Sequence, residues 1–419
     1  MSVNIGIVQF PGSNTERETA LALKRSKMRP VEILWNASPD IVKNCDGYVI
    51  SGGFSFEDRS RAGIIASLEP IMSTLKQESE KGKPVFGICN GAQILVESGL
   101  VPGIKKNQPT ISLTDNKRIK NDQIVGTGYY NTWANLKMCV PPKSTAFTRH
   151  LNFEEIINVP FAHAEGRFII PDNLLKELID NHQTVFRYSN DDGDLIKEFP
   201  TNPNGSDYNL AAISNAKGNV LAMMPHPERT AFGDKLFSSM REFIDKKITL
   251  KKNILSFIPD KNIIENYLPG KKSTEWFIDM VITDNEAATV QNALMKMGMD
   301  VNISRQQHWE IETSGDTKTV LNKIENTGEL FNSNKEYLSD LSKEKNKASF
   351  LVRQKEDMHS QAKFESIKKR FNINELIQLK RGVVWNISIK NTNFNSVLNN
   401  ILDTNIFFNP LSHECFRIS

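Results

Sequence analysis

The sequence predicts an α/β domain with a parallel sheet, followed by two smaller α+β units. Short apolar runs alternate with helix-like segments over the first 250 or so of its 419 residues. Strands that alternate with helices form parallel sheets covered on both faces. A segment interrupted by Pro259, Pro269 and Gly270 then breaks the pattern, and beyond it the sequence repeats itself.

The first domain begins with the apolar run NIGIVQ at residues 4–9, which predicts a strand. The turn PGSN follows, and residues 15–27 have the composition of a helix that begins at a capping residue. The further elements expected in this domain are strands at 31–35, 47–50, 84–88 and 220–224, and a helix at 64–81.

The repeat begins after residue 273. HWEIET corresponds to VWNISI, VLNKI to VLNNI and FNSNKEY to FNPLSHE, and TEWFIDMVIT resembles KASFLVRQKE. Trp309 and Trp385 are 76 residues apart, and Phe331 and Phe408 are 77 apart. Each copy has the order strand, helix, strands, helix, strand, which is typical of a split βαβ, ferredoxin-like unit. We expect the sheets of the two units to cover one another. The helices are expected at 287–297, 317–327, 362–371 and 393–404.

These patterns divide the chain into four parts. We expect the α/β domain at residues 1–249, a linker at 250–273, and the two repeats at 274–345 and 346–419. Neither repeat contains an obvious nucleophile or metal cluster.

The composition indicates a folded protein of the cytoplasm. Hydrophobic residues make up 39% and charged residues 24%, and the net charge of +3 gives no independent case for nucleic acid. Four scattered cysteines without CxxC spacing argue against a disulfide framework or a structural zinc site. The N-terminus MSVNIGIVQF has no signal-peptide pattern, and no apolar run approaches the roughly 20 residues that cross a bilayer. We therefore expect no membrane contact.

The segment PVFGICNGAQILVESGL places Cys89 between a short strand and a helix. Gly87 and Gly91 flank it, as a sharp strand-to-helix turn requires, and such a turn exposes a nucleophile at the edge of a sheet. The N-terminus of the following helix would lower the pKa of the thiol. The local pattern fits an inert core cysteine equally well.

A histidine and a carboxylate follow far along the chain, in LAMMPHPERT. His226 stands between two prolines at the end of an apolar run, and Glu228 lies two residues later. A lone histidine is more often structural. The nearby carboxylate favours a catalytic role, because it can orient the imidazole and stabilise its cation, which would complete a thiol triad with Cys89.

The third candidate element is the glycine pair in YVISGGFSFEDRSRAG. Gly52, Gly53 and Phe54 follow a predicted strand, and adjacent glycines let backbone N–H groups approach a ligand closely. Glycine pairs also occur in ordinary turns. Beside the cysteine turn, this one is a candidate oxyanion hole, with the N–H of Asn90 as another donor.

These motifs carry a resemblance to known proteins. GICNGAQ matches the GxCxGxQ nucleophile motif of class I, or triad, glutamine amidotransferases, and PHPE supplies their histidine and glutamate. The chain further resembles, over nearly all of residues 1 to 245, the PurQ family of glutaminase subunits of phosphoribosylformylglycinamidine synthase. The segments that carry this likeness, in the family's order, are QFPGSNTERETALAL, SGGFSFEDRSRAGIIA, GICNGAQIL, PFAHAEGRF and NPNGSDYNLAAISNAKGNVLAMMPHPER.

The resemblance implies a flavodoxin-like domain that hydrolyses glutamine. Cys89 would attack the carboxamide, and His226, oriented by Glu228, would shuttle the proton. Gln93 and the segment His163-Ala164-Glu165-Gly166 would shape the glutamine pocket, although His163 could equally be a structural loop histidine. The expected oxyanion or glutamine-binding residues are Gly52, Gly53, Phe54, Asn90, Gln93 and His163, with no metal. The sequence departs from the family's pattern at Thr15, Glu16 and Phe56-Glu57-Asp58.

The C-terminal repeats resemble PurS, the small ferredoxin-like subunit that bridges the glutaminase and the synthetase of this enzyme. The resemblance implies that ammonia is passed to a separate synthetase subunit that binds formylglycinamide ribonucleotide. The chain has no GxxxxGK[ST] phosphate loop, so ATP and Mg²⁺ are expected in that partner and no cofactor in this chain. The alternatives are a class I glutaminase that serves another acceptor, a thiol hydrolase or peptidase, and a scaffold with a vestigial triad.

Overall fold

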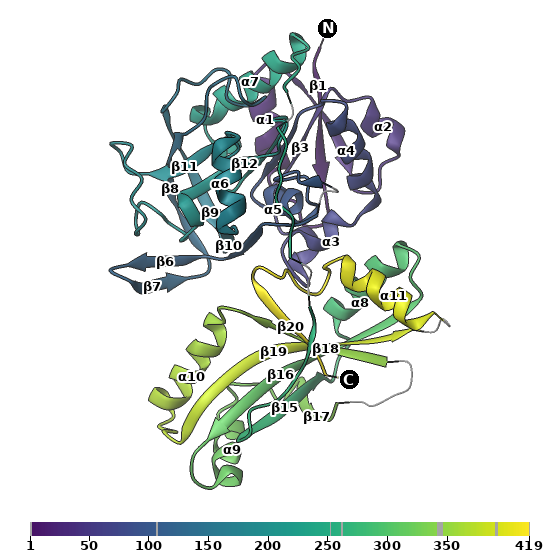
Figure 1. The fold of residues 1–419 in the computed structure, drawn as a ribbon, viewed down its shortest axis with the longest axis vertical. Helices are drawn as coiled ribbons and strands as arrows, with labels where there is room; N and C mark the ends of the chain where they lie inside the picture. The colour runs from purple at the N-terminus through teal and green to yellow at the C-terminus, as the bar shows by residue number, and fades with distance from the viewer. Residues whose placement is uncertain are drawn as a thin grey trace. The chain divides into compact units, whose positions relative to one another are not determined.

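The computed structural model describes residues 2–105, 108–251, 253–260, 263–341, 347–389 and 393–418. The chain divides into two compact units, Met1–Asp260 and Lys261–Ser419 (Figure 1). The division falls within the segment expected as a linker. The boundary expected between the repeats, at 345/346, lies outside the described residues.

The first unit is built on a nine-stranded sheet in the order β2-β1-β3-β4-β13-β12-β11-β8-β9. The strands from β2 to β13 run parallel to their neighbours, and the rest pair antiparallel, so the sheet is mixed with a parallel half. The strands of the sheet are β1 (Asn4–Gln9), β2 (Arg29–Leu34), β3 (Gly47–Ile50), β4 (Val85–Ile88), β8 (Tyr130–Met138), β9 (Ile156–His163), β11 (Phe186–Ser189), β12 (Leu210–Ser214) and β13 (Val220–Met223).

Helices cover the sheet on both faces, as the alternation along β4 shows. The ring of Phe86 lies 5.6 Å from that of Phe237 on one face. A side chain at the next position, Gly87, would instead meet Leu95 on the other face. The helices of the unit are α1 (Glu16–Arg25), α2 (Pro39–Lys43), α3 (Ile64–Ser67), α4 (Pro70–Glu80), α5 (Asn90–Glu97), α6 (Asp172–Asp180) and α7 (Asp234–Asp245).

The helix expected at 64–81 is two helices, α3 and α4. Pro70 begins α4, and a proline inside a helix would remove one hydrogen bond and clash with the preceding turn. The unit also contains two small antiparallel pairs. They are formed by β5 (Ser112–Asp115) with β10 (Glu165–Ile169), and by β6 (Lys117–Lys120) with β7 (Gln123–Thr127).

The second unit contains one seven-stranded sheet in the order β14-β20-β18-β19-β16-β15-β17 (Figure 1). Its strands are β14 (Glu265–Asn266), β15 (Ser273–Met280), β16 (Val301–Thr313), β17 (Glu336–Ser339), β18 (Lys347–Gln354), β19 (Leu376–Ile389) and β20 (His413–Arg417). Its helices are α8 (Asn285–Lys296), α9 (Thr317–Asn326), α10 (Met358–Arg370) and α11 (Phe394–Asp403).

The two repeats join along the long central strands β16 and β19. Arg305 pairs with Trp385, and Trp309 pairs with Arg381. Under the 76-residue offset of the repeat, Arg305 corresponds to Arg381 and Trp309 corresponds to Trp385. The two arginine–tryptophan pairs are therefore equivalent to one another. The duplication is therefore built into the sheet as a local two-fold relation.

This arrangement differs from the expectation that the two sheets would cover one another. The sheets join edge to edge instead, because the edge strands β16 and β19 pair with each other through backbone hydrogen bonds. One long strand stands between the helices of each repeat, which makes three strands per repeat apart from β14. The ferredoxin-like assignment stays a prediction.

A shared core unites the repeats. Val320 and Ile324 of α9 belong to the same buried cluster as Ile367 of α10 and Leu376 of β19. Burial of apolar side chains is the main stabilising contribution to a fold, so each repeat depends on the other. Among the described residues, no helix has the length and apolar composition that crossing a membrane would require.

Candidate active site

Three neighbouring parallel strands end at one edge of the first unit's sheet. β3, β4 and β13 stand next to one another, and Ile88 at the end of β4 pairs with Met223 at the end of β13. Ligands of such sheets bind at the carboxyl ends of the strands. Gly52, Cys89 and His226 all follow these ends within three residues.

Cys89 lies on a strained turn between β4 and α5. Its φ of 53° and ψ of −109° are unusual for a residue with a side chain, and they turn the chain sharply into the helix. A Cβ at Gly87 would lie 2.5 Å from the Gly91 carbonyl oxygen, and one at Gly91 would lie 2.1 Å from that of Ile50. Only glycine fits at both positions, which explains why glycines flank Cys89 in the sequence.

His226 and Glu228 complete a triad with Cys89. His226 Nδ1 and Glu228 Oε1 are 2.7 Å apart, and the other side of the imidazole hydrogen-bonds Cys89. All three residues are buried. The backbone N–H of His226 donates to the carbonyl of Pro160 at 2.8 Å, which fixes the segment that presents the ring.

The triad favours an imidazolium. Burial lowers the pKa of His226, but the charges of Glu228 and Cys89 outweigh it and raise the pKa to about 10. A protonated His226 beside the sulfur stabilises the thiolate, which is the nucleophilic form of a cysteine.

The glycine segment after β3 lies against the triad. A Cβ at Gly52 would come within 3.2 Å of His226 Cε1, so the absence of a side chain lets the imidazole approach. The N–H of Gly52 donates to Thr15 Oγ1 at 2.8 Å, and that of Phe54 donates to the Gly12 carbonyl at 2.9 Å. Within the described residues, the N–H groups of Gly53 and Asn90 have no acceptor. Of the three N–H groups expected to hold the oxyanion, those of Gly53 and Asn90 are free to do so, whereas that of Phe54 is engaged by Gly12.

Asn90 and Gln93 link the glycine segment to α5. Asn90 Oδ1 accepts the N–H of Ser55 at 3.0 Å, and Asn90 Nδ2 donates to Gln93 Oε1 at 2.9 Å. Gln93 Nε2 donates in turn to the carbonyl oxygen of Glu165. The Gln93 side chain is thus engaged with the protein, where it positions the loops around the thiol.

His163 lies beside the triad without a hydrogen bond on either ring nitrogen in the described structure. Its ring stacks on Phe161 at a centroid distance of 4.0 Å. A side chain at Gly166 would collide with the imidazole, so that glycine makes room for it. Burial, together with the charge on His226, lowers the pKa of His163 to about 3, which leaves the ring neutral.

Two carboxyl groups lie next to residues of the site: Asp58 at Asn90, and Glu165, whose carbonyl oxygen accepts from Gln93. Burial raises the pKa of Asp58 to about 7 despite a hydrogen bond from Asn90. Burial and nearby acids, Asp115 and Asp58 among them, raise the pKa of Glu165 to about 8. Perturbed carboxyls in this position are candidates for contact with substrate. The sequence marked Asp58 only as a departure from the family's pattern, whereas Glu165 belongs to the segment expected to shape the glutamine pocket.

Tyr188 is a further residue near the thiol. Burial raises its pKa well above the usual value, and the charge of Cys89 adds to the effect. It comes from the antiparallel half of the sheet, and a lone tyrosine in a short strand gives no sequence signal. Among the described residues, no group of three or more His, Cys, Asp or Glu side chains could hold a metal ion.

Three features of this site together define a class of enzyme. They are a thiol on a strand-to-helix turn, a buried histidine–glutamate pair, and two free N–H groups at the end of parallel strands. They are the elements of a cysteine-dependent triad enzyme of the glutamine amidotransferase type. The chain belongs to the family of CobB/CobQ-like glutamine amidotransferase domains, whose model matches residues 2–252.

Curated relatives are similar to a part of the chain of about the same length. The phosphoribosylformylglycinamidine synthase subunit PurQ of Methanothrix thermoacetophila is 43% identical over 265 residues, which are 58% of this chain and 99% of the relative. The subunit of that name from Synechocystis sp. is 38% identical over 229 residues, 54% of this chain and 92% of the relative. A solved structure of PurLQS from Thermotoga maritima has a chain 29% identical, covering 58% of this chain and 100% of that one, with a TM-score of 0.46.

Proposed function

We propose that this chain is the glutaminase component of a phosphoribosylformylglycinamidine synthase. The observation that carries the proposal is the 43% identity to a PurQ subunit matched over 99% of its length. The close grouping of Cys89, His226 and Glu228 supports it independently. The reaction converts glutamine to glutamate and ammonia.

The first half of the reaction forms a thioester. The Cys89 thiolate attacks the carboxamide carbon of glutamine, and the negative charge that develops on the oxygen is stabilised by the N–H groups of Gly53 and Asn90. His226 then gives its proton to the departing amide nitrogen, which leaves as ammonia. Glu228 keeps the imidazole oriented and stabilises its cationic form.

The second half hydrolyses the thioester. His226, now neutral, takes a proton from a water molecule, which attacks the thioester carbon. The tetrahedral intermediate collapses, the C–S bond breaks and glutamate leaves. Cys89 and His226 return to their charged pair. His163 stays neutral beside them and adds no competing positive charge.

Ammonia passes to a separate synthetase subunit that converts formylglycinamide ribonucleotide to formylglycinamidine ribonucleotide. That subunit binds ATP and Mg²⁺, and this chain needs no cofactor of its own. Free ammonia would be protonated near neutral pH and lost, which favours a channel between docked subunits. The C-terminal repeats, as PurS-like units, provide the bridge to the synthetase, and the complex works in the cytoplasm.

Glutamate release tests the proposal. The purified chain is assayed alone, and with the synthetase, its nucleotide and its ribonucleotide substrate. We expect weak release by the isolated chain, strong stimulation by the synthetase and none from a Cys89→Ala chain. Cys139→Ala is the matched control, because this thiol lies on a different strand connection and should leave the rate unchanged. A correctly folded chain that releases no glutamate under any condition would overturn the proposal.

A further inference from the structure

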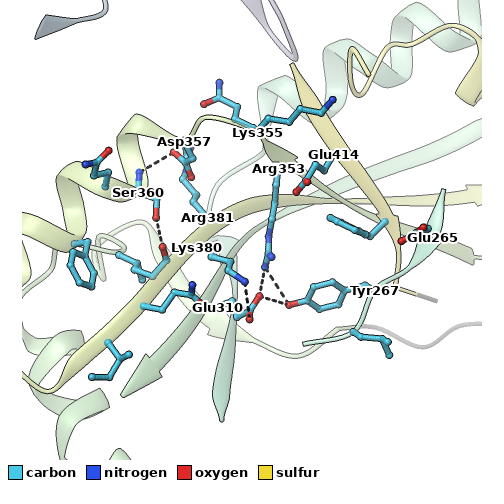
Figure 2. A pocket seen from close by; sticks show the side chains of 18 of the residues that line it. Glu265, Tyr267, Glu310, Arg353, Lys355, Asp357, Ser360, Lys380, Arg381 and Glu414 are labelled. Carbon is cyan, nitrogen blue, oxygen red and sulfur yellow. Dashed lines mark hydrogen bonds and ion pairs between the residues drawn. The ribbon is translucent and has the colours of Figure 1, made fainter. Parts of the chain in front are cut away.

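The second unit contains a pocket of about 670 Å³ (Figure 2). Strands β14, β16, β18, β19 and β20 and helix α10 contribute to its walls, and every lining residue belongs to Lys261–Ser419. Four cations line it, in addition to acids and aromatic side chains. The lining cations are Arg353, Lys355, Lys380 and Arg381.

Two of these cations have a counter-charge in the chain. Arg353 Nη2 donates to Glu310 Oε2 at 2.8 Å, and Lys380 Nζ lies 3.7 Å from Glu310 Oε1. The hydroxyl of Tyr267 donates to the same carboxylate at 3.0 Å, and Figure 2 shows this group joined by dashed lines. Burial raises the pKa of Glu310, but these bonds and charges outweigh it and lower the pKa to about 2. Glu310 is therefore ionised and satisfies this side of the pocket.

Arg381 has no such partner. It makes no hydrogen bond or ion pair with any residue that the structure describes, and its Nε is buried without an acceptor. Lys355 donates to the neutral carbonyl oxygen of Pro410 at 2.7 Å, which leaves its charge uncompensated. An N–H removed from water without an acceptor is costly, so an empty pocket leaves the Nε of Arg381 unsatisfied.

The first repeat shows what satisfies this arginine. Arg305, the counterpart of Arg381 under the 76-residue offset, donates to Asp284 Oδ2 at 2.8 Å and also pairs with Glu286. Asp284 is the N-cap of α8, and Glu286 lies two residues beyond it. In the second repeat, Asp357 is the N-cap of α10, and two residues beyond it stands His359. One carboxylate that binds Arg305 therefore has no equivalent at Arg381.

The shape and walls of the pocket suit an organic ligand. Phe364 and Ile377 line it, and Ile377 is half exposed although apolar. The exposed acids Glu265 and Glu414 also line it, from β14 and β20. In the view of Figure 2 they lie on the side of Arg353 away from Arg381. The other end of the pocket is thus acidic, while the acid beside Arg381 in Figure 2 is Asp357, whose Oδ1 accepts the N–H of Ser360.

We propose that this pocket binds a small organic anion, whose phosphate or carboxylate group is held by Arg381 and Lys355. The apolar part of the ligand lies against Phe364 and Ile377. The anionic group takes the place that a side-chain carboxylate fills at Arg305, because the guanidinium fork matches both carboxylate and phosphate oxygens.

Calorimetric titration of the full chain tests this with three probes. AMP presents a phosphate, succinate presents carboxylates, and adenosine is the uncharged control. We expect either AMP or succinate to bind. If AMP binds, adenosine should bind at least tenfold more weakly than AMP, because it lacks the phosphate. The acid that binds identifies the group. Absence of binding by both acids at about 1 mM, the range of weak metabolite sites, overturns the proposal.

Variants locate the binding. Arg381→Ala should weaken it about tenfold or more, and Arg381→Lys should weaken it less, because charge is kept but the fork is lost. The matched control is Lys369→Ala, which removes an exposed positive charge of α10 outside the pocket and should bind as the original chain does. Equal binding by Arg381→Ala, or equal losses in the two variants, would contradict the proposal.

Two further chains keep the test decisive. Lys355 is exposed, so Lys355→Ala should fold even if Arg381→Ala does not, and it should also weaken binding. A Lys355→Ala chain that keeps the original unfolding temperature is correctly folded. If such a chain also binds the anion with full affinity, this result would count against the site. Cys89→Ala should bind the anion normally, because the pocket has no lining residue in the first unit. This separates the anion site from the proposed glutaminase function.

Discussion

The imidazole of His226 lies between two groups that both favour its protonated form. Glu228 contacts Nδ1 at 2.7 Å, and Cys89 accepts from the other side. Because the site is buried, each of these charges acts at lower dielectric than it would in water. The thiolate and imidazolium forms therefore depend on one another, and the carboxylate supports both.

Replacement of Glu228 by glutamine should change the pH profile of the enzyme. Without the carboxylate the pKa of His226 falls from its raised value, so the imidazolium is lost at lower pH. We expect the alkaline limb of glutamate release by the complex to move down by about 1–2 pH units. The maximal rate should fall by about 10²-fold or more.

Glu242→Gln is the matched control for this prediction. It also breaks a histidine–carboxylate pair, that of His150 Nε2 and Glu242 Oε2 at 2.7 Å, but this pair lies outside the triad. The control should keep the original profile. An unchanged alkaline limb in Glu228→Gln would show that the carboxylate does not set the pKa of His226.

Asp58 links the site to the stability of the first unit. Its pKa is about 7 in the folded chain, above the ordinary value of 3.8, because the carboxyl is buried. Between these two values the folded chain holds a proton that the unfolded chain has released. The free energy of unfolding therefore falls as pH rises through this window.

Asp58→Asn should remove this penalty while keeping the oxygen that accepts from Asn90 Nδ2. We expect the variant to be more stable than the original chain at pH 8, by about 1–3 kcal/mol, with little gain at pH 4. Urea unfolding at the two pH values measures this. An equal effect at both would mean that the proton on Asp58 is not the cause.

At the scale of elements, the close approach of α5 to the sheet places the thiol. Gly91 in the first turn of α5 lies against the carbonyl of Ile50 at the end of β3. Backbone atoms cannot rotate away from an added methyl group, so α5 would have to move, and Cys89 precedes its first residue.

Gly91→Ala should therefore reduce both stability and glutaminase activity. The expected loss is about 1–3 kcal/mol, the usual cost of overpacking, because a Cβ would lie 2.1 Å from the carbonyl oxygen. Thermal unfolding and glutamate release measure the two effects. Gly270→Ala is the control, since the nearest atoms there, at 3.0 Å, are side-chain ends that can shift. Normal activity in Gly91→Ala would refute this account of the turn.

The sequence predicted the elements that have strong local patterns. The strand before Cys89 and the glycines around it could be read directly, because sterics dictate them. The antiparallel half of the sheet could not, since its strands depend on partners distant in the chain. Tyr188, whose pKa is raised further by the charge of Cys89, comes from that half. Asp58 was missed for a similar reason, because its pKa arises from burial and not from its neighbours in sequence.

At the scale of the whole molecule, the duplication in the second unit is a folding constraint. The pairing of β16 with β19 and the cluster of Val320 and Ile324 with Ile367 both need residues from each repeat. A single repeat would expose this apolar surface and leave the long edge of β16 unpaired, which favours association with another chain.

The two repeats should therefore fold together and not separately. A fragment of residues 261–419 is expected to unfold in one cooperative transition, monitored by circular dichroism in urea. A fragment of residues 261–341 should be unfolded as a monomer, because α9 lacks the α10 side chains that complete its core. The local two-fold relation allows one exception, in which two copies of the short fragment pair through β16. Sedimentation distinguishes these cases, and a folded, monomeric short fragment would contradict the shared core as the source of stability.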